Sequence, residues 1–442
     1  MLRPTVSFRK EHFGGIAFDG RPGRSDYLSL NETAFQLLRA FDEADEFTDC
    51  PLSNPVNLSP ELRVSISNLV SVGLLANRHE GNDQRFKMFR GQTHAPSGWL
   101  AAPTVVDIYP HFFCNQMCKF CYVGFQVENP PKETLGLSKI PHLVENLNSA
   151  GVFQVGILGG EPFLYPHLRE LVEALTDSRI SVSIATNGTV LDKDLLCLCR
   201  DRMVNLDISI QADEADLHDR IVQKPGTHTR ATRTLTTAIE LGVPLLLSAV
   251  LNPMNVHRAV PFVEWGARLG VRFFGFFDPE PTVFALQHGM RLNFKEFFTA
   301  IKAAKKRGRE LGVGVNSNCH YDFLLDENTS SFQPNHPLAK YLYGDKAGRS
   351  KVDVLPNGDI YPNYELFFRD QWKLGNIFED ELFLLWRSSQ VVKTIKGSKL
   401  PHSCQKCIHS PICGGGLLGR RLAQGSPTFP PNDCPILNGE WP

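Results

Sequence analysis

The chain has 442 residues, which is too long for one compact core, so we expect two or three domains. Hydrophobic residues make up 42% of it and charged residues 21%, a composition that is typical of a globular enzyme and excludes a disordered chain. The formal net charge of -1 gives no electrostatic reason to expect nucleic acid or an anionic membrane as a partner.

The N-terminal segment is predicted to form a separate unit, residues 1–85. SFRKEHFGGIAFD and SDYLSL show strand-like alternation, and Asn31 opens a helix with one apolar face. Ser59 and Pro60 are typical of the N-cap and first turn of a second helix. A short sheet followed by helices is a winged-helix pattern, which usually binds DNA. Residues 1–80, however, carry eight Lys or Arg against eleven Asp or Glu, which is the wrong sign for a phosphate-binding surface.

Two segments of this unit, FGGIAF and LNETAFQLL, resemble the PqqD-like recognition domain. The resemblance implies that residues 1–85 bind the leader of a ribosomal precursor peptide by adding it as a strand to a sheet edge. Residues 86–100 are polar and are predicted to be a linker.

The N-terminus, MLRPTVSFRKEHF, lacks the apolar core of a signal peptide, so a cytoplasmic protein is expected. The longest apolar run, VPLLLSAVL at 243–251, is too short to span a bilayer and reads as a buried strand. Because cytoplasmic thiols stay reduced, the eleven cysteines are better explained as metal ligands than as disulfides.

The stretch PHFFCNQMCKFCYVG places Cys114, Cys118 and Cys121 in a CxxxCxxC spacing. A structural zinc site needs four ligands, whereas three thiolates on a 4Fe-4S cluster leave one iron open for a small ligand. A partial zinc knuckle is the alternative reading of the same cysteines. The motif resembles the signature of the radical SAM superfamily, which implies a 4Fe-4S cluster that binds S-adenosylmethionine (SAM).

The region 101–310 alternates strand and helix signals and predicts a parallel α/β barrel. The resemblance implies that it is the partial (β/α)6 barrel of radical SAM enzymes, in which chemistry occurs at the carboxyl ends of the strands. The expected strands are TVVDIYP (104–110), FQVGILGG (153–160), ISVSIATNG (180–188), NLDISIQA (205–212), PLLLSAVL (244–251) and VRFFGFFDP (271–279).

The same resemblance assigns contacts with SAM to residues that follow the first four strands. A GGEP element contacts the SAM amino group, an aromatic residue packs near adenine, and polar groups hold the ribose and carboxylate. In this chain the matching residues are Phe120, Tyr122, Gly159, Gly160, Glu161, Pro162, Thr186, Asn187, Ser209 and Gln211.

The C-terminal region, residues 311–442, contains a second cysteine set: Cys404, Cys407, Cys413 and Cys434. Spacing alone leaves zinc and an iron-sulfur cluster equally open. The flanking GDKAGRSKVDVLPNGDIYPNYE and KLGNIFEDELFLLW resemble the SPASM domain of peptide-modifying radical SAM enzymes, which normally carries two auxiliary 4Fe-4S clusters.

Three cysteines of that family are replaced here, by Asp345, Asn363 and Leu417. In the family these three belong to the auxiliary cluster nearer the active site, whereas the ligands of the outer cluster are all retained. The sequence therefore predicts one auxiliary 4Fe-4S cluster and one SAM-binding cluster per chain. Cys197, Cys199 and Cys50 are expected to be incidental or buried.

The sequence as a whole predicts a radical SAM maturase of a ribosomal precursor peptide, supplied with electrons by a reductant such as flavodoxin or ferredoxin, with no nucleic acid or membrane partner. We expect hydrogen abstraction followed by an intrapeptide cross-link, either a carbon-carbon cyclophane or a thioether. Epimerisation remains an alternative, with Cys319 as the candidate hydrogen donor, as do excision of a backbone fragment, maturation of a protein side chain as in sulfatase activation, and a non-catalytic zinc-binding role.

Overall fold

The structure is a computed structural model of the chain and describes residues 6–20, 26–43, 59–72, 74–75, 89–90, 99–123, 131–279, 282–317, 319–324, 341, 345–418, 421 and 434–439. Cys50 and most of the expected linker lie outside these residues. Within them, no helix is long and apolar enough to cross a membrane.

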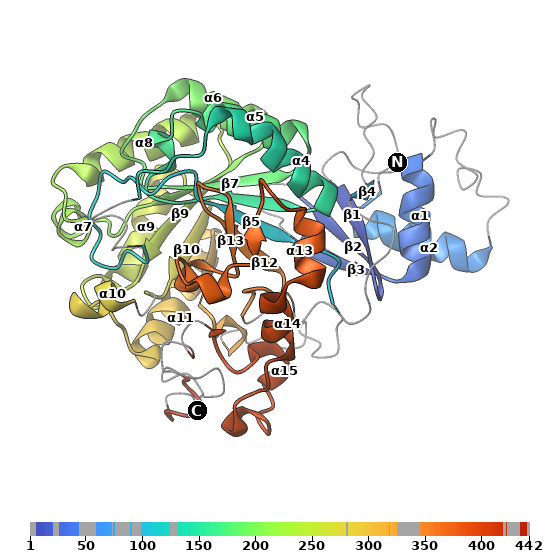
Figure 1. Cartoon of the computed structure of the whole chain (residues 1–442). Helices are drawn as coiled ribbons and strands as arrows, with labels where there is room; N and C mark the ends of the chain where they lie inside the picture. Colours follow the sequence, from blue (N-terminus) through green and yellow to red (C-terminus); the bar gives the residue numbers. More distant parts are fainter. Residues whose placement is uncertain are drawn as a thin grey trace.

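The N-terminal unit is a four-stranded sheet with two helices, as its sequence predicts (Figure 1). The strand order is β3-β2-β1-β4, and the elements are β1 (Val6–Glu11), β2 (Gly14–Asp19), β3 (Asp26–Leu30), β4 (Phe89–Arg90), α1 (Glu32–Glu43) and α2 (Pro60–Ser71). The predicted cap of α2 is confirmed, because the Ser59 hydroxyl accepts from the Leu62 amide. Phe8, Phe35 and Leu38 are buried between the sheet and the helices.

The central domain confirms the six predicted parallel strands and adds a seventh that the sequence analysis did not predict. The strands are β5 (Val105–Ile108), β6 (Gln154–Ile157), β7 (Ser181–Thr186), β8 (Asn205–Ser209), β9 (Leu245–Val250), β10 (Phe273–Phe277) and β11 (Gly314–Ser317). They pair in sequence order, with the additional strand β11 at one edge. The predicted domain boundary at residue 310 precedes this strand.

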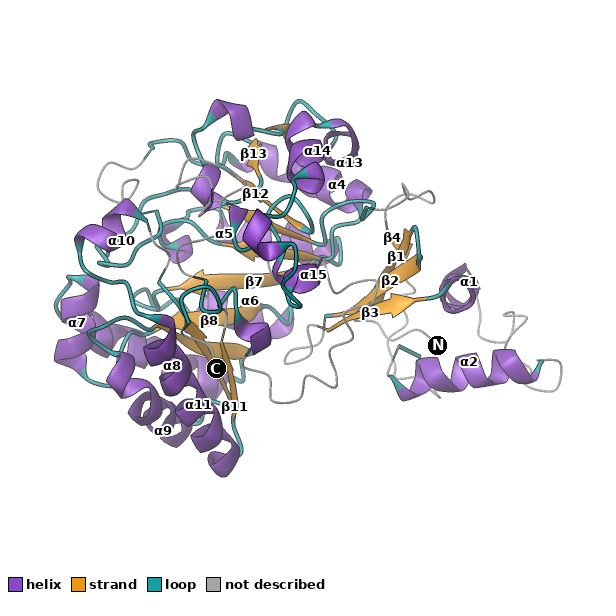
Figure 2. Ribbon diagram, turned by 90° about the horizontal axis from the view of Figure 1, so that it is seen from below, coloured by secondary structure: helices purple, strands orange, loops and turns teal. Residues whose placement is uncertain are grey.

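Helices cover the outer face of this sheet, whose curvature leaves a partial barrel (Figures 1 and 2). They are α4 (Ile140–Ala150), α5 (Leu168–Asp177), α6 (Lys193–Asp201), α7 (Ala215–Val222), α8 (Thr227–Leu241), α9 (Ala259–Leu269), α10 (Val283–Gln287) and α11 (Phe294–Leu311). Strand alternation explains the two faces: on β7, Val182 and Ile184 are buried in the core, whereas Ser183 between them is exposed on the inner face.

The C-terminal region continues the same sheet, because β12 pairs in parallel with β5. Its elements are β12 (Lys351–Val354), β13 (Asp359–Tyr361), β14 (Gly375–Asn376), α13 (Leu382–Ser388), α14 (Gln390–Gly397) and α15 (Ser410–Cys413). The sheet therefore has ten strands, in the order β11-β10-β9-β8-β7-β6-β5-β12-β13-β14. The C-terminal cysteines are thus attached to the barrel through continuous backbone hydrogen bonding.

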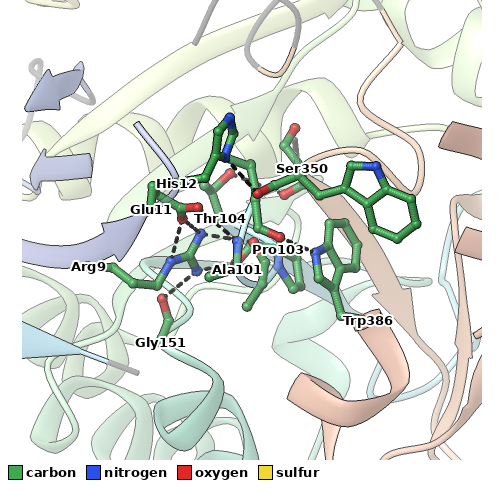
Figure 3. Close-up of polar contacts among 12 residues, drawn as sticks. Arg9, Glu11, His12, Ala101, Pro103, Thr104, Gly151, Ser350 and Trp386 are labelled. Carbon is green, nitrogen blue, oxygen red and sulfur yellow. Dashed lines mark hydrogen bonds and ion pairs between the residues drawn. The ribbon is translucent and has the colours of Figure 1, made fainter. Parts of the chain in front are cut away.

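A buried arginine joins the N-terminal unit to the barrel (Figure 3). Arg9 on β1 is 0% exposed and donates to the carbonyl oxygens of Ala102, Pro103 and Gly151, at 2.9, 3.0 and 2.9 Å. It also donates twice to Glu11 Oε1, at 2.7 and 2.9 Å. The three carbonyls belong to segments that precede β5 and β6, so the N-terminal unit packs at the amino ends of the barrel strands.

Candidate active site

The loop carrying the first three cysteines follows β5 and is held against α7. The backbone amides of Met117 and Lys119 donate to the carbonyl oxygens of Val222 and Ile221, both at 3.1 Å. The Cys121 amide donates to the Cys118 carbonyl at 3.0 Å, which turns the chain back on itself. These bonds place the CxxxCxxC segment over the carboxyl end of the sheet, where the sequence analysis expected it.

The three thiols are buried and close to one another. Burial, together with the neighbouring Cys121 and Cys114, raises the pKa of Cys118 well above its usual value. Burial also raises the pKa of Cys114 to about 11 and that of Cys121 to about 12. Such thiols need a compensating cation to become thiolates, which is what a bound iron-sulfur cluster provides.

No three His, Cys, Asp or Glu side chains among the described residues are gathered as they would be around a single metal ion. The assignment of a cluster therefore depends on the donor set and on the mutual proximity of the thiols. Three soft sulfur donors in one loop fit an iron-sulfur cluster, and the residues present are compatible with it.

The GGEP loop after β6 lies directly against the cysteine loop. The Gly160 amide donates to the His111 carbonyl at 3.1 Å, and the Glu161 amide donates to the Phe113 carbonyl at 2.9 Å. A Cβ added at Gly160 would lie 1.9 Å from the Phe113 carbonyl oxygen. Gly159 adopts φ +121°, which other residues rarely do. Both glycines are thus required for the close approach of two backbones.

The Glu161 carboxylate is 1% exposed and holds the end of β7. It accepts from Thr186 Oγ1 at 2.6 Å and from the Asn187 amide at 2.7 Å. It also accepts from the Phe163 amide at 3.0 Å. Burial raises its pKa to about 7, against the lowering effect of these hydrogen bonds. In this structure Glu161 is a positioning residue that joins two loops predicted to contact SAM.

The Asn187 side chain joins the same assembly to the first cysteine. Its Nδ2 donates to Asn115 Oδ1 at 2.8 Å and lies 3.8 Å from Cys114 Sγ. Thr189 Oγ1 donates to Asn187 Oδ1 at 2.6 Å and accepts from Asn115 Nδ2 at 2.8 Å. The sequence analysis did not find Asn115 and Thr189, although both are polar residues inside or beside a predicted motif.

The two residues predicted after β8 bond to each other. Gln211 Nε2 donates to Ser209 Oγ at 2.7 Å, and Gln211 Oε1 accepts from the Val250 amide at 2.9 Å. The Gln211 amide donates to His218 Nδ1 at 2.9 Å, and Asn255 Nδ2 donates to the Gln211 carbonyl at 2.7 Å. Gln211 is therefore a fixed and buried residue, while Ser209 is half-buried.

The aromatic residues on either side of Cys121 face different surroundings. Phe120 packs with Leu217, Ile221 and Met254, whereas the Tyr122 ring lies 4.6 Å from that of Tyr364 in the C-terminal region. Pro162 begins a short 3-10 turn, Pro162–Leu164, and is buried. The residues predicted from strands one to four are thus gathered at one end of the sheet.

The second cysteine set also converges. Burial, with the nearby Cys434 and Cys407 thiols, raises the pKa of Cys404, even though the Ser403 hydroxyl opposes this. Burial raises the pKa of Cys413 to about 12, and Cys434 and Cys404 contribute to this rise. Four mutually close thiols supply the complete ligand set of a four-iron cluster.

Two of the three replaced cysteine positions make hydrogen bonds instead. Both carboxylate oxygens of buried Asp345 accept from backbone amides, those of Ala347 at 2.9 Å and Leu418 at 2.8 Å. Asn363 Nδ2 donates to Glu365 Oε2 at 2.9 Å. The third position, Leu417, has an apolar side chain, so these three positions offer no thiolate.

The remaining described cysteines lie in apolar surroundings. Cys319 is 7% exposed within the barrel core, and its sulfur accepts from the Tyr321 amide at 3.5 Å. Cys199 on α6 is fully buried, as expected, and Cys197 is half-buried.

Comparisons with known proteins agree with this geometry. Residues 108–266 match the family model of the radical SAM superfamily, and residues 346–408 match that of the SPASM iron-sulfur cluster-binding domain. The chain is 23% identical over 355 residues to mycofactocin maturase MftC of Mycobacterium tuberculosis, covering 75% of this chain and 83% of that protein. It is 21% identical over 425 residues to the subtilosin biosynthesis protein AlbA of Bacillus subtilis, covering 89% and 85%.

The crystal structure of Streptococcus suis SuiB bound to precursor peptide SuiA superposes with a TM-score of 0.80 at 18% identity, over 98% of this chain and 99% of that one. This likeness shows the same fold, including the arrangement of the N-terminal unit, barrel and C-terminal region.

Proposed function

Because the chain belongs to the radical SAM superfamily and carries a SPASM domain, we propose that it is a maturase that cross-links residues of a ribosomally made precursor peptide. The observation that carries this proposal is the gathering of three thiols, the GGEP loop and the ends of β7 and β8 at one end of the barrel. A 4Fe-4S cluster and SAM bound there supply a 5'-deoxyadenosyl radical by one-electron cleavage of SAM.

The residues of the chain have distinct tasks in this proposal. Cys114, Cys118 and Cys121 hold three irons of the SAM-binding cluster. Backbone groups of Gly159 and Gly160 approach the SAM amino group. The predicted SAM contacts at Phe120, Tyr122, Pro162, Thr186, Asn187, Ser209 and Gln211 surround the same space.

The relatives support a peptide as substrate. MftC is named a maturase, AlbA is a bacteriocin biosynthesis protein, and SuiB was crystallised with its precursor peptide. In this chain the N-terminal unit, residues 1–85, would bind the leader. Its strand β3 is an edge strand of the described sheet, and its unpaired side can accept an added strand.

Two observations favour a cross-link over epimerisation. Cys319, the candidate hydrogen donor, lies in the packed barrel core. A cross-link requires removal of one electron and one proton after hydrogen abstraction, and the auxiliary site formed by Cys404, Cys407, Cys413 and Cys434 can accept the electron. We therefore assign residues 101–310 to radical generation and 311–442 to a domain with one auxiliary cluster, with residues 86–100 as the linker. A flavodoxin or ferredoxin would supply the reducing electron.

The decisive experiment is mass spectrometry of the precursor peptide after anaerobic incubation with reconstituted enzyme, SAM and reductant in deuterated water. Loss of two hydrogens without deuterium uptake is expected for a cross-link. Gain of one deuterium with no other change would show epimerisation instead, and would refute the proposed reaction.

The ligand assignment has its own test. Replacing Cys114, Cys118 and Cys121 by Ala should abolish SAM cleavage and leave about four irons per chain, against about eight in the wild type. Retained SAM cleavage would contradict the assignment of the first cluster, and about twelve irons in the wild type would contradict the count of one auxiliary cluster.

A further inference from the structure

A buried arginine lies beside the second cysteine set. Arg421 is 1% exposed and is among the largest fully buried side chains of the described residues. It is close enough to Cys404 for the two to affect each other's protonation, and it also interacts with Cys413 and Asp345. A buried guanidinium is costly unless negative charge compensates it, and four thiolates on a cluster provide such charge.

A second nitrogen-bearing side chain approaches the same ligands from the barrel side. His320 Nε2 lies 3.4 Å from Cys413 Sγ, within hydrogen-bonding distance for sulfur. The Gly416 amide donates to this sulfur as well, at 3.2 Å. Cys413 is therefore the most heavily hydrogen-bonded sulfur of the set.

A third cation lies over the turn that follows Cys413. A Cβ added at Gly414 would fall 2.3 Å from Nη1 of Arg349, so this guanidinium packs directly on the Gly414 backbone. Arg349 and Arg421 also interact with each other electrostatically. Two guanidinium groups and an imidazole thus border the second cysteine set, and Asp345 is the carboxylate found among them.

Asp345 fixes the loop that carries Arg421. Its Oδ2 accepts from the Leu418 amide at 2.8 Å, three residues before the arginine in the chain. Its Oδ1 accepts from the Ala347 amide at 2.9 Å, two residues before Arg349. One carboxylate in place of a cysteine therefore positions both segments that supply the guanidinium groups.

We propose that Arg421 and His320 set the reduction potential of the auxiliary cluster, raising it so that the cluster can accept an electron from the peptide. The reduction potential of an iron-sulfur cluster rises with positive charge nearby and with hydrogen bonds to its sulfurs, because both stabilise the reduced, more negative form. Burial makes the effect of Arg421 large, since solvent does not screen it. This inference deepens the proposed function and rests on its assignment of Cys404, Cys407, Cys413 and Cys434 as cluster ligands.

Exposed Lys406 provides a matched control. It lies between two of the ligands in the sequence, Cys404 and Cys407, but its side chain is exposed. Water and salt screen an exposed charge, so removing it should affect the cluster far less than removing a buried one.

The test is a redox titration of the auxiliary cluster, followed by electron paramagnetic resonance. It uses the full chain in which Cys114, Cys118 and Cys121 are replaced by Ala, so that one cluster is observed. In this background Arg421→Met and His320→Leu should each shift the midpoint potential to more negative values, with unchanged iron content, while Lys406→Met leaves it unchanged. Arg421→Lys, which keeps the charge, should restore most of the shift.

The outcomes separate this inference from the proposed function. An intact cluster whose potential is the same in Arg421→Met, His320→Leu and the parent would overturn the inference. Absence of any cluster in the parent would refute the ligand assignment instead. If Arg421→Met loses its iron, the result for His320→Leu decides, because that side chain is only half-buried and can be shortened without disturbing the loop of Asp345.

Discussion

Replacement of Arg9 by Met should weaken the attachment of the N-terminal unit to the barrel. Arg9 makes five hydrogen bonds, three of them to carbonyl oxygens of segments that precede the barrel strands. Its partner Glu11 is also 0% exposed, and burial raises the Glu11 pKa while Arg9 lowers it. The substitution leaves a buried carboxylate without its cation.

The expected loss is about 3–5 kcal/mol of unfolding free energy, the usual cost of removing one partner of a buried ion pair. A control is Lys10→Met on the same strand, which removes a partly exposed ion pair with Glu32 and should cost less than about 1 kcal/mol. The double variant Arg9→Met with Glu11→Leu should recover much of the loss, because neither buried charge then remains.

Denaturant unfolding monitored by tryptophan fluorescence measures this effect, because two tryptophans report on the junction. Trp386 Nε1 donates to the Leu100 carbonyl at 2.8 Å, and Lys396 Nζ lies 4.3 and 4.1 Å from the ring centres of Trp99 and Trp386. An Arg9→Met variant no less stable than Lys10→Met, or a double variant no better than the single one, would refute the argument.

Two further predictions concern the active site. Gly160→Ala should abolish SAM binding in equilibrium dialysis, because its Cβ would clash with the Phe113 carbonyl, whereas Gly136→Ala, with nothing within 4 Å of its Cβ, should bind normally; equal binding by both would show that the two loops separate easily. Burial, assisted by a neighbouring histidine, lowers the pKa of His218 to about 4 from 6.5, so the folded state takes up its proton later than the unfolded state as pH falls. Its contribution to stability is fully present above pH 6.5 and declines by up to about 1.4 kcal/mol per pH unit between pH 6.5 and 4; His218→Asn, which keeps an acceptor for the Gln211 amide, should flatten this dependence in urea titrations at pH 5 and 7.

The local features of the fold were readable from the sequence. The six strands were visible because buried parallel strands are short apolar runs, and the N-cap of α2 because Ser59 and Pro60 have specific positional roles. The seventh strand, β11, was not predicted, because its sequence, GVNS, alternates polar and small residues and lacks an apolar run.

The candidate site divides in the same way. Cys114, Cys118 and Cys121, and the GGEP element, are contiguous motifs whose spacing alone indicates their chemistry. The parallel topology then brings Thr186, Asn187, Ser209 and Gln211 to the same end of the sheet. Sequence reasoning did not show that Glu161 would bond to Thr186, 25 residues away, rather than remain free for a ligand.

The sequence by itself determined which residues could hold clusters and in which domain, because those ligands follow one another along the chain at fixed spacing. Only the tertiary structure decided what surrounds them. The contacts of His320 with Cys413 and of Asp345 with Leu418 span 93 and 73 residues, and that of Arg9 with Gly151 spans 142. No local pattern encodes such pairs, because they exist only once the strands have paired and buried charges have been forced to find partners.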